Sequence, residues 1–176
     1  MDSHLEFIYV SEVSRQCRYA LACFEAMKSA YKEDRVDDVF RNLDGLVGHA
    51  ARLSLLFWPT QGDQDRGEYL RDLFGIKEDN VLANRGLRND LQHFDERLDT
   101  WIKSTGGRRF IDSNISRPGD IDIDGEQPLR NFYWKECAYT FRSETYSIYP
   151  IALSIAEILR EAEAKLSSRW IRGYCR

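Results

Sequence analysis

Four stretches of the chain repeat apolar residues at spacings of three and four, the pattern of a helix with one buried face. This pattern predicts helices over residues 3–32, 36–58, 80–105 and 146–170. A shorter helix is predicted over 68–74, where Gly75 provides a stop. Pro59 should end the second long helix, and Gly106 and Gly107 the third. The chain is therefore expected to be mainly α.

The pattern changes between residues 108 and 141. Residues 130–134 and 137–141 are rich in aromatic and strand-favouring residues, and Ile121 and Ile123 alternate with polar residues. We expect a small β-hairpin or three-stranded insertion near residues 108–141, before the last helix. Its aromatic residues could either pack on the helices or stack on single-stranded RNA; they are Phe132, Tyr133 and Trp134.

The helix predicted over 80–105 has polar groups of unusual chemistry beside its apolar stripe. At about 100° per residue, the apolar residues fill a stripe about 100° wide; they are Ala83, Leu87, Leu91, Phe94, Leu98, Trp101 and Ile102. Asn89 and His93, four positions apart, should share one face. Arg88 diverges from His93 by about 140°. Two copies facing each other across a twofold axis could bring an arginine and a histidine into one shared cleft.

The segment Arg88-Asn89-Asp90-Leu91-Gln92-His93 resembles the signature of the HEPN superfamily, in which an arginine and a polar residue are followed by a histidine after four to six positions. The resemblance implies an up-and-down helical bundle, here one domain over residues 1–176, that forms a homodimer. Many members are metal-independent endoribonucleases of toxin–antitoxin, abortive-infection or other defence systems. In a subgroup paired with nucleotidyltransferase antitoxins, a modified tyrosine follows the histidine by two positions; Asp95 stands there in this chain.

The motif suggests a role for each of its polar side chains. His93 would transfer protons at the ribose 2′-hydroxyl or at the leaving oxygen, since histidine exchanges protons near neutral pH. Arg88 would stabilise the phosphorane-like transition state, and Asn89 would orient His93 or the phosphate. No metal or cofactor is expected, because the 2′-hydroxyl supplies the nucleophile. Weaker candidates for RNA contacts are Arg85, Gln92, Arg97, Arg108, Arg109 and Arg130.

Charge leaves other interpretations open. A net charge of -4 at pH 7 argues against a protein that coats nucleic acid tightly, but not against an enzyme that holds RNA briefly. One alternative is a non-catalytic helical module that recognises a protein partner or a nucleotide through the same face. Another is a solvated helix face whose charges pair with one another; these are Arg88, Asp95, Glu96 and Asp99.

The remaining chemistry of the chain points to few other sites. The four cysteines lack the paired short spacing of a zinc site or a disulfide framework, and the three histidines are too scattered for a ligand set. His49 is expected to pack or hydrogen-bond at a helix surface, or alternatively to join His93. With no signal peptide and no membrane-spanning run, we expect a cytoplasmic protein without a membrane partner. The resemblance to the HEPN superfamily adds an antitoxin or another regulatory protein as a candidate partner.

Overall fold

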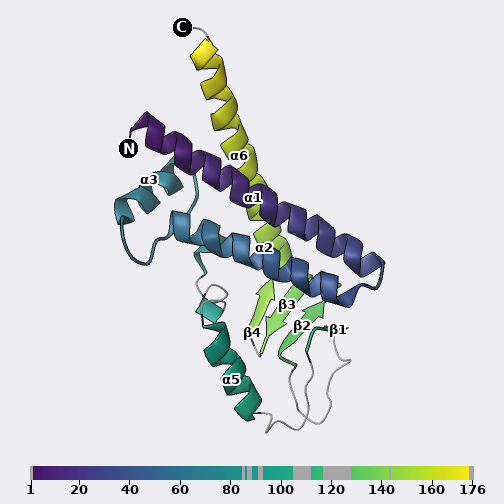
Figure 1. Ribbon diagram of the computed structural model, residues 1–176. Coiled ribbons are helices and arrows are strands. Elements are labelled where there is room, and N and C mark those ends of the chain that lie inside the picture. The colour runs from purple at the N-terminus through teal and green to yellow at the C-terminus, as the bar shows by residue number, and fades with distance from the viewer. Residues whose placement is uncertain are drawn as a thin grey trace.

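The computed structural model describes residues 2–84, 86, 89–90, 93–104, 112–116, 128–142 and 144–174 (Figure 1). Most of this part of the chain is helical, and a small four-stranded sheet accompanies the helices, which confirms the mainly α class with a β insertion. The elements are α1 (Ser3–Lys32), α2 (Val36–Phe57), α3 (Gln64–Phe74), the 3-10 helix η1 (Val81–Ala83), α5 (Phe94–Ser104), β1 (Asn114–Ser116), β2 (Arg130–Tyr133), β3 (Ala138–Phe141), β4 (Glu144–Ser147) and α6 (Ile148–Tyr174).

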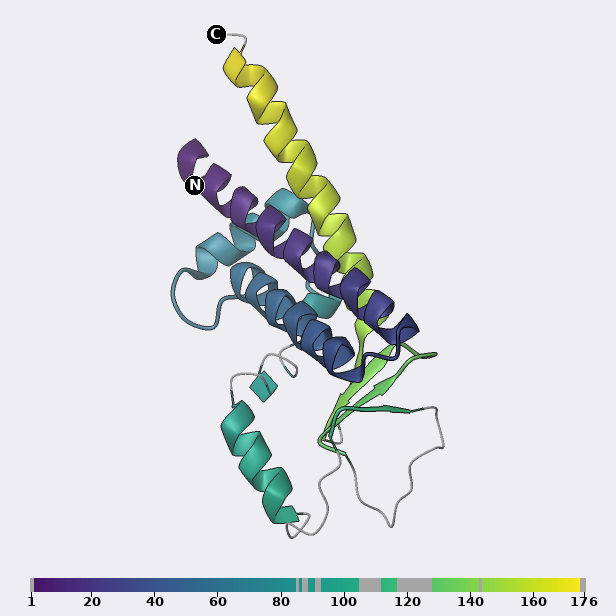
Figure 2. The same ribbon diagram turned by 45° about the vertical axis from the view of Figure 1, so that its right-hand side comes forward.

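Three long helices form the main body of the molecule. α1 and α2 run antiparallel, and α6 packs along the opposite side of α1 (Figures 1 and 2). The C-terminal part of α6 extends past the other helices, at the end away from the sheet. The residues that meet between these helices follow the predicted spacing; they include Val13, Cys17 and Ala20 of α1, Leu43, Leu46 and Leu53 of α2, and Ile151, Ile155 and Ile158 of α6.

Side chains at the helix ends explain where the helices begin and end. Asp2 caps α1, since its carboxylate accepts hydrogen bonds from the N–H groups of His4 (2.8 Å) and Leu5 (3.0 Å). Asp63 caps α3 in the same way, so this helix begins four residues earlier than expected. Gly75 ends it in the left-handed conformation (φ 64°) that glycine adopts without strain.

The prediction of a single helix over residues 80–105 is wrong. η1 covers only Val81–Ala83, and Asn84 then adopts an extended backbone (φ -63°, ψ 118°). The Asn84 side chain accepts a hydrogen bond from the N–H of Gly86 (2.9 Å), which competes with the backbone bonds of a helix. Upstream, the Asn80 amide donates to the Ser154 hydroxyl of α6 (3.0 Å) and so holds η1 against that helix. Local side-chain bonds therefore replace the first turns of the expected helix.

The apolar stripe predicted for 80–105 is only partly buried. Trp101 of α5 lies in the core, whereas Phe94 and Ile102 are 38% and 45% exposed. In Figures 1 and 2, α5 projects from the main body on the same side as the sheet, separate from α1 and α6. The expectation that this whole stripe lies against a core is therefore wrong for α5.

The sheet has the order β1-β2-β3-β4. β2 and β3 form the expected antiparallel hairpin, with Phe132 opposite Tyr139, and β1 pairs with β2 in parallel. β4 adds a fourth strand beyond the expected region 108–141, because Tyr146 pairs with Tyr139 across the β3–β4 ladder. The last helix consequently begins at Ile148 rather than at 146. The extended pieces expected at Ile121 and Ile123 lie outside the described residues.

The aromatic residues of the sheet pack on the helices. Phe132 is fully buried, and the Trp134 ring stacks on Tyr31 of α1 with 3.6 Å between ring centroids. One hydrophobic cluster includes residues from all the α-helices, from η1 and from the sheet. Within the described ranges, no helix is both long and apolar enough to cross a lipid bilayer.

Candidate functional site

Three residues of the motif segment are described, and they lie on or beside one helical turn. The N–H of His93 donates to the carbonyl of Asn89 (3.0 Å), and the N–H of Arg97 donates to the carbonyl of His93 (2.9 Å). These bonds confirm the expected helical spacing of Asn89 and His93. The other predicted site residues of this region lie outside the described residues; they are Arg85, Arg88, Gln92, Arg108 and Arg109.

His93 presents its imidazole to solvent. Its side chain is 51% exposed, and its Nδ1 lies 3.4 Å from a carboxylate oxygen of Glu96, one turn further along. Asn89, also exposed, lies one turn before it. Nδ1 therefore faces a carboxylate, and Nε2 is the ring nitrogen that this carboxylate does not contact. Glu96 thus lies beside His93. Its expected pairing with Arg88 involves a residue outside the described part of the chain.

Asp90, to which the motif assigned no role, is the anchor of this segment. Its carboxylate accepts hydrogen bonds from Arg97 Nε (3.1 Å) and from the Tyr146 hydroxyl of β4 (2.5 Å). Burial, and then this bond to Asp90, raise the pKa of the Tyr146 phenol, so that it stays a donor. The two-turn spacing of Asp90 and Arg97 is visible in the sequence, whereas the contact with Tyr146 is not.

Two arginines predicted to touch RNA make ion pairs with carboxylates. Arg97 pairs with Asp90, and Arg130 pairs with Asp112 and, at 3.4 Å, with Asp44. Burial alone would raise the pKa of Asp112, but the hydrogen bond and charge of Arg130 outweigh it and lower that pKa. Arg130 thus joins β2 to the segment before β1 and to α2; its contact with RNA stays a prediction.

His49 lies on the side of α2 that faces α1. Its Nδ1 is 2.7 Å from the Gln16 carbonyl oxygen, and its ring lies against Tyr19. Burial, followed by the nearby charge of Arg52, lowers the pKa of His49. These contacts confirm His49 as a packing and hydrogen-bonding residue, and they tie it to α1.

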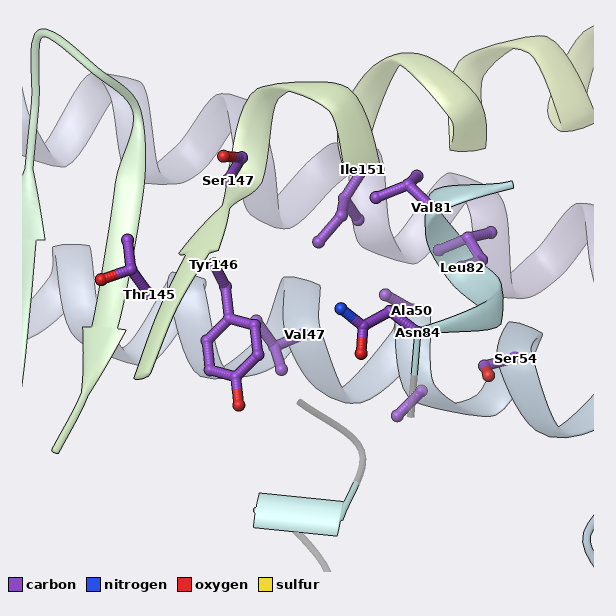
Figure 3. A pocket seen from close by; sticks show the side chains of 11 residues that line it. Val47, Ala50, Ser54, Val81, Leu82, Asn84, Thr145, Tyr146, Ser147 and Ile151 are labelled. Atoms are coloured by element: carbon purple, nitrogen blue, oxygen red, sulfur yellow. The ribbon is translucent and has the colours of Figure 1, made fainter. Parts of the chain in front are cut away.

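A cavity of about 250 Å³ lies where α2, η1, β4 and the start of α6 meet (Figure 3). Tyr146 forms one side of the cavity, and the Asn84 side chain lies between Tyr146 and Ser54 in Figure 3. The sequence did not indicate this cavity, because its lining comes from segments about 100 positions apart. Tyr146 therefore belongs both to the cavity and to the anchor of the His93 turn.

The described residues also bear on two other kinds of site, a metal site and a reactive thiol. No group of three or more His, Cys, Asp or Glu side chains there is arranged to hold a metal ion. Cys17, Cys23 and Cys137 are thiols, and burial raises the pKa of Cys17 to about 12, which keeps it an inert core residue.

Comparisons with known proteins found no family model, no curated protein and no solved structure that matches this chain.

Proposed function

We propose that this chain is a metal-independent endoribonuclease of HEPN type that cleaves RNA at a homodimer cleft, as a toxin or defence effector in the cytoplasm. The observation that carries the proposal is the spacing of Arg88 and His93 in a HEPN-like motif, together with an exposed His93 imidazole on an anchored helical turn. An exposed base on a fixed support is what proton transfer to a bound substrate requires.

The proposed reaction is an internal transesterification. The 2′-oxygen attacks the adjacent phosphorus and loses its proton, the bond from phosphorus to the 5′-oxygen breaks, and the leaving oxygen takes up a proton. His93 transfers a proton in one or both steps, and its Nδ1 contact with Glu96 helps to orient the ring. Arg88 stabilises the charge that develops on the phosphate oxygens. The products are a 2′,3′-cyclic phosphate and a 5′-hydroxyl.

A homodimer is part of the proposal. Ideal helical geometry separates residues five positions apart, such as Arg88 and His93, by about 140°. Two copies could instead combine an arginine with a histidine in one cleft. Directly after His93, α5 leaves Phe94 and Ile102 substantially exposed, and apolar side chains of this kind favour the centre of a protein interface. An antitoxin or another regulatory protein would cover the same region.

Cleavage of a mixed RNA pool in EDTA tests the proposal. We expect wild-type protein to cleave, and His93→Ala to lose cleavage while keeping its circular dichroism spectrum and its dimer. His4→Ala, which changes an exposed histidine at the start of α1, is the matched control and should cleave normally. Cleavage retained by highly purified His93→Ala would remove the assignment.

The second candidate is a non-catalytic module that binds a nucleotide or a protein partner through the same face. The observation that favours it is the cavity beside Tyr146, whose described lining residues carry no charge and could receive the base of a nucleotide, together with the net charge of -4. Expression in cells distinguishes the two functions. A ribonuclease should arrest growth, and Arg88→Ala should relieve the arrest, whereas a binding module should give no arrest in either form.

A further inference from the structure

The cavity beside Tyr146 has the size of a site for one small ring system. Pockets that take drug-sized ligands enclose roughly 300–1,000 Å³, and this one encloses about 250 Å³. It is bounded by secondary-structure elements on several sides, as Figure 3 shows for α2, η1, β4 and α6. A single purine or pyrimidine ring is a better match for this space than a whole nucleotide.

The walls of the cavity favour a neutral, planar group. None of the described residues that line it carries a charge, so a phosphate would find no counter-ion there. Tyr146 supplies an aromatic ring on which a base could stack. Apolar side chains form most of the rest of the lining; they are Val47, Ala50, Ala51, Val81, Leu82 and Ile151.

Four residues with a hydroxyl or amide line the cavity besides Tyr146, namely Ser54, Asn84, Thr145 and Ser147, and we single out Ser54 and Asn84 for contacts to the edge of such a ring. The hydroxyl of Ser54 lines the cavity, is 3% exposed as a residue, and has no hydrogen-bond partner within the described part of the chain. Buried hydroxyls rarely stay unpaired in native proteins, so a ligand atom at this point would satisfy it. Asn84 already uses its carbonyl oxygen to accept from Gly86, and its NH2 group is therefore the end that can donate to a ligand.

Hydrogen bonds link the same cavity to the helical turn that carries His93. The Tyr146 ring faces the cavity while its hydroxyl bonds to Asp90, one residue from Asn89, whose carbonyl accepts from the N–H of His93. A ring stacked on Tyr146 would thus be held by the residue that also anchors the imidazole.

We infer that this cavity receives one unpaired nucleobase of the RNA substrate, stacked on Tyr146 and read along its edge by Asn84 and Ser54. The inference rests on the proposed endoribonuclease function, which it extends to the substrate: single-stranded RNA with a base preference beside the cleaved bond. Recognition of unstacked bases by an aromatic side chain and polar edge contacts is the usual way in which proteins read single-stranded RNA.

Nucleoside binding to the full-length His93→Ala protein tests the cavity independently of cleavage. The probes are adenosine, guanosine, cytidine and uridine, followed by NMR titration. We expect at least one nucleoside to bind, and Asn84→Ala or Ser54→Ala to weaken that binding about tenfold, the effect of one lost hydrogen bond. Gln61→Ala, an exposed amide residue on a different surface, is the matched control and should bind as the parent does.

Ser54→Ala also shows whether weaker nucleoside binding could be due to a loss of folding. Because it removes a buried hydroxyl without a partner, it should raise the thermal midpoint of the free protein while it weakens nucleoside binding. In the catalytically intact background, Asn84→Ala should flatten the base preference at the cleavage sites of a randomised RNA.

The outcomes separate the cavity from the catalytic assignment. Nucleoside binding that depends on Asn84 and Ser54, without any RNA cleavage by wild type, would remove the ribonuclease and keep the base site. Cleavage that depends on His93, combined with no nucleoside binding and an unchanged preference in Asn84→Ala, would overturn the base site and keep the ribonuclease. Binding that none of the variants alters would also overturn it.

Discussion

The Tyr146 hydroxyl donates a hydrogen bond to the Asp90 carboxylate at 2.5 Å, although 56 positions separate the two residues in the sequence. The bond joins β4 to the helical turn that carries His93. Arg97 completes the arrangement by donating to the other oxygen of the same carboxylate. The position of the candidate catalytic turn therefore depends on a strand that the motif does not include.

Tyr146→Phe should destabilise the protein. The substitution removes the hydroxyl that donates to the Asp90 carboxylate and leaves the bond from Arg97 in place. Hydrogen bonds to charged groups contribute about 1.5–3 kcal/mol. We expect the free energy of unfolding in urea to fall by an amount in this range. Tyr149→Phe, at an exposed tyrosine nearby, should change it by less than about 0.5 kcal/mol. Equal effects of the two substitutions would show that the bond to Asp90 contributes nothing special.

Arg130→Gln should cost more than the loss of a surface ion pair. The side chain of Asp112 is 10% exposed and that of Arg130 is 23% exposed, so the substitution leaves a largely buried carboxylate without its cation. Breaking a buried pair costs roughly 3–5 kcal/mol, and partial exposure should reduce this to about 2–3 kcal/mol. The measurement is chemical unfolding at pH 7.

Arg41→Gln is the matched control for Arg130, because Arg41 pairs with Asp38 while its own side chain is 71% exposed. A pair of this kind contributes about 0–1 kcal/mol. If Arg130→Gln cost no more than Arg41→Gln, the cluster around Asp112 would be a surface feature without a role in holding β2 to α2.

Two glycines of α2 should respond in opposite ways to alanine. A Cβ at Gly45 would lie 2.8 Å from the sulfur of Cys23 on α1, whereas a Cβ at Gly48 meets its nearest atom, on Arg52, at 3.9 Å. Gly48→Ala should stabilise α2 by about 1 kcal/mol through helix propensity, and Gly45→Ala should lose that gain or destabilise the protein. Thermal unfolding measures both.

Replacing the neighbour should restore the gain at Gly45. In a Cys23→Ala background the sulfur is gone and the nearest contact becomes the Cys23 Cβ position at 3.7 Å, an ordinary packing distance. Gly45→Ala should then stabilise about as much as Gly48→Ala. A penalty that persists in this background would show that the close approach of α1 and α2 does not depend on this pair.

His49 should make the protein less stable as the solution becomes mildly acidic. Its pKa is lowered from the usual 6.5 by burial and then by Arg52, so the unfolded chain takes up the proton before the folded protein does. The contribution of His49 to the free energy of unfolding is therefore fully present above about pH 6.5. It falls as the pH drops below that value, until the pH is below the pKa of His49 in the folded protein. His49→Gln lacks this proton uptake.

The free energy of unfolding of wild type minus that of His49→Gln should therefore decrease as the pH is lowered from 7.5 to 5.5. Chemical denaturation at both pH values provides the comparison. The contacts that His49 makes with Gln16, Tyr19 and Arg52 are altered in the variant at both pH values, so the change of the difference with pH reports the proton uptake of His49. A difference that stays constant or grows toward acid would contradict the direction of the pKa shift.

The long helices and the β2–β3 hairpin could be predicted from the sequence, because their signals are local. Apolar spacing placed α1, α2 and α6 close to their observed bounds, and Pro59 and Gly75 marked two helix ends. The motif residues Asn89 and His93 also keep their predicted one-turn relationship, since helical hydrogen bonds join residues four positions apart.

Contacts between distant segments decided the rest. The sequence did not predict that Asn84 would interrupt the expected helix, that Tyr146 would form a fourth strand, or that Asp90 would anchor the His93 turn. Each of these depends on which side chain lies opposite another after packing, and periodicity along one segment carries no such information. Local pattern thus determined the helices, the hairpin and the candidate motif, while tertiary packing decided the break before α5, the ion pairs of Arg97 and Arg130, and the cavity beside Tyr146.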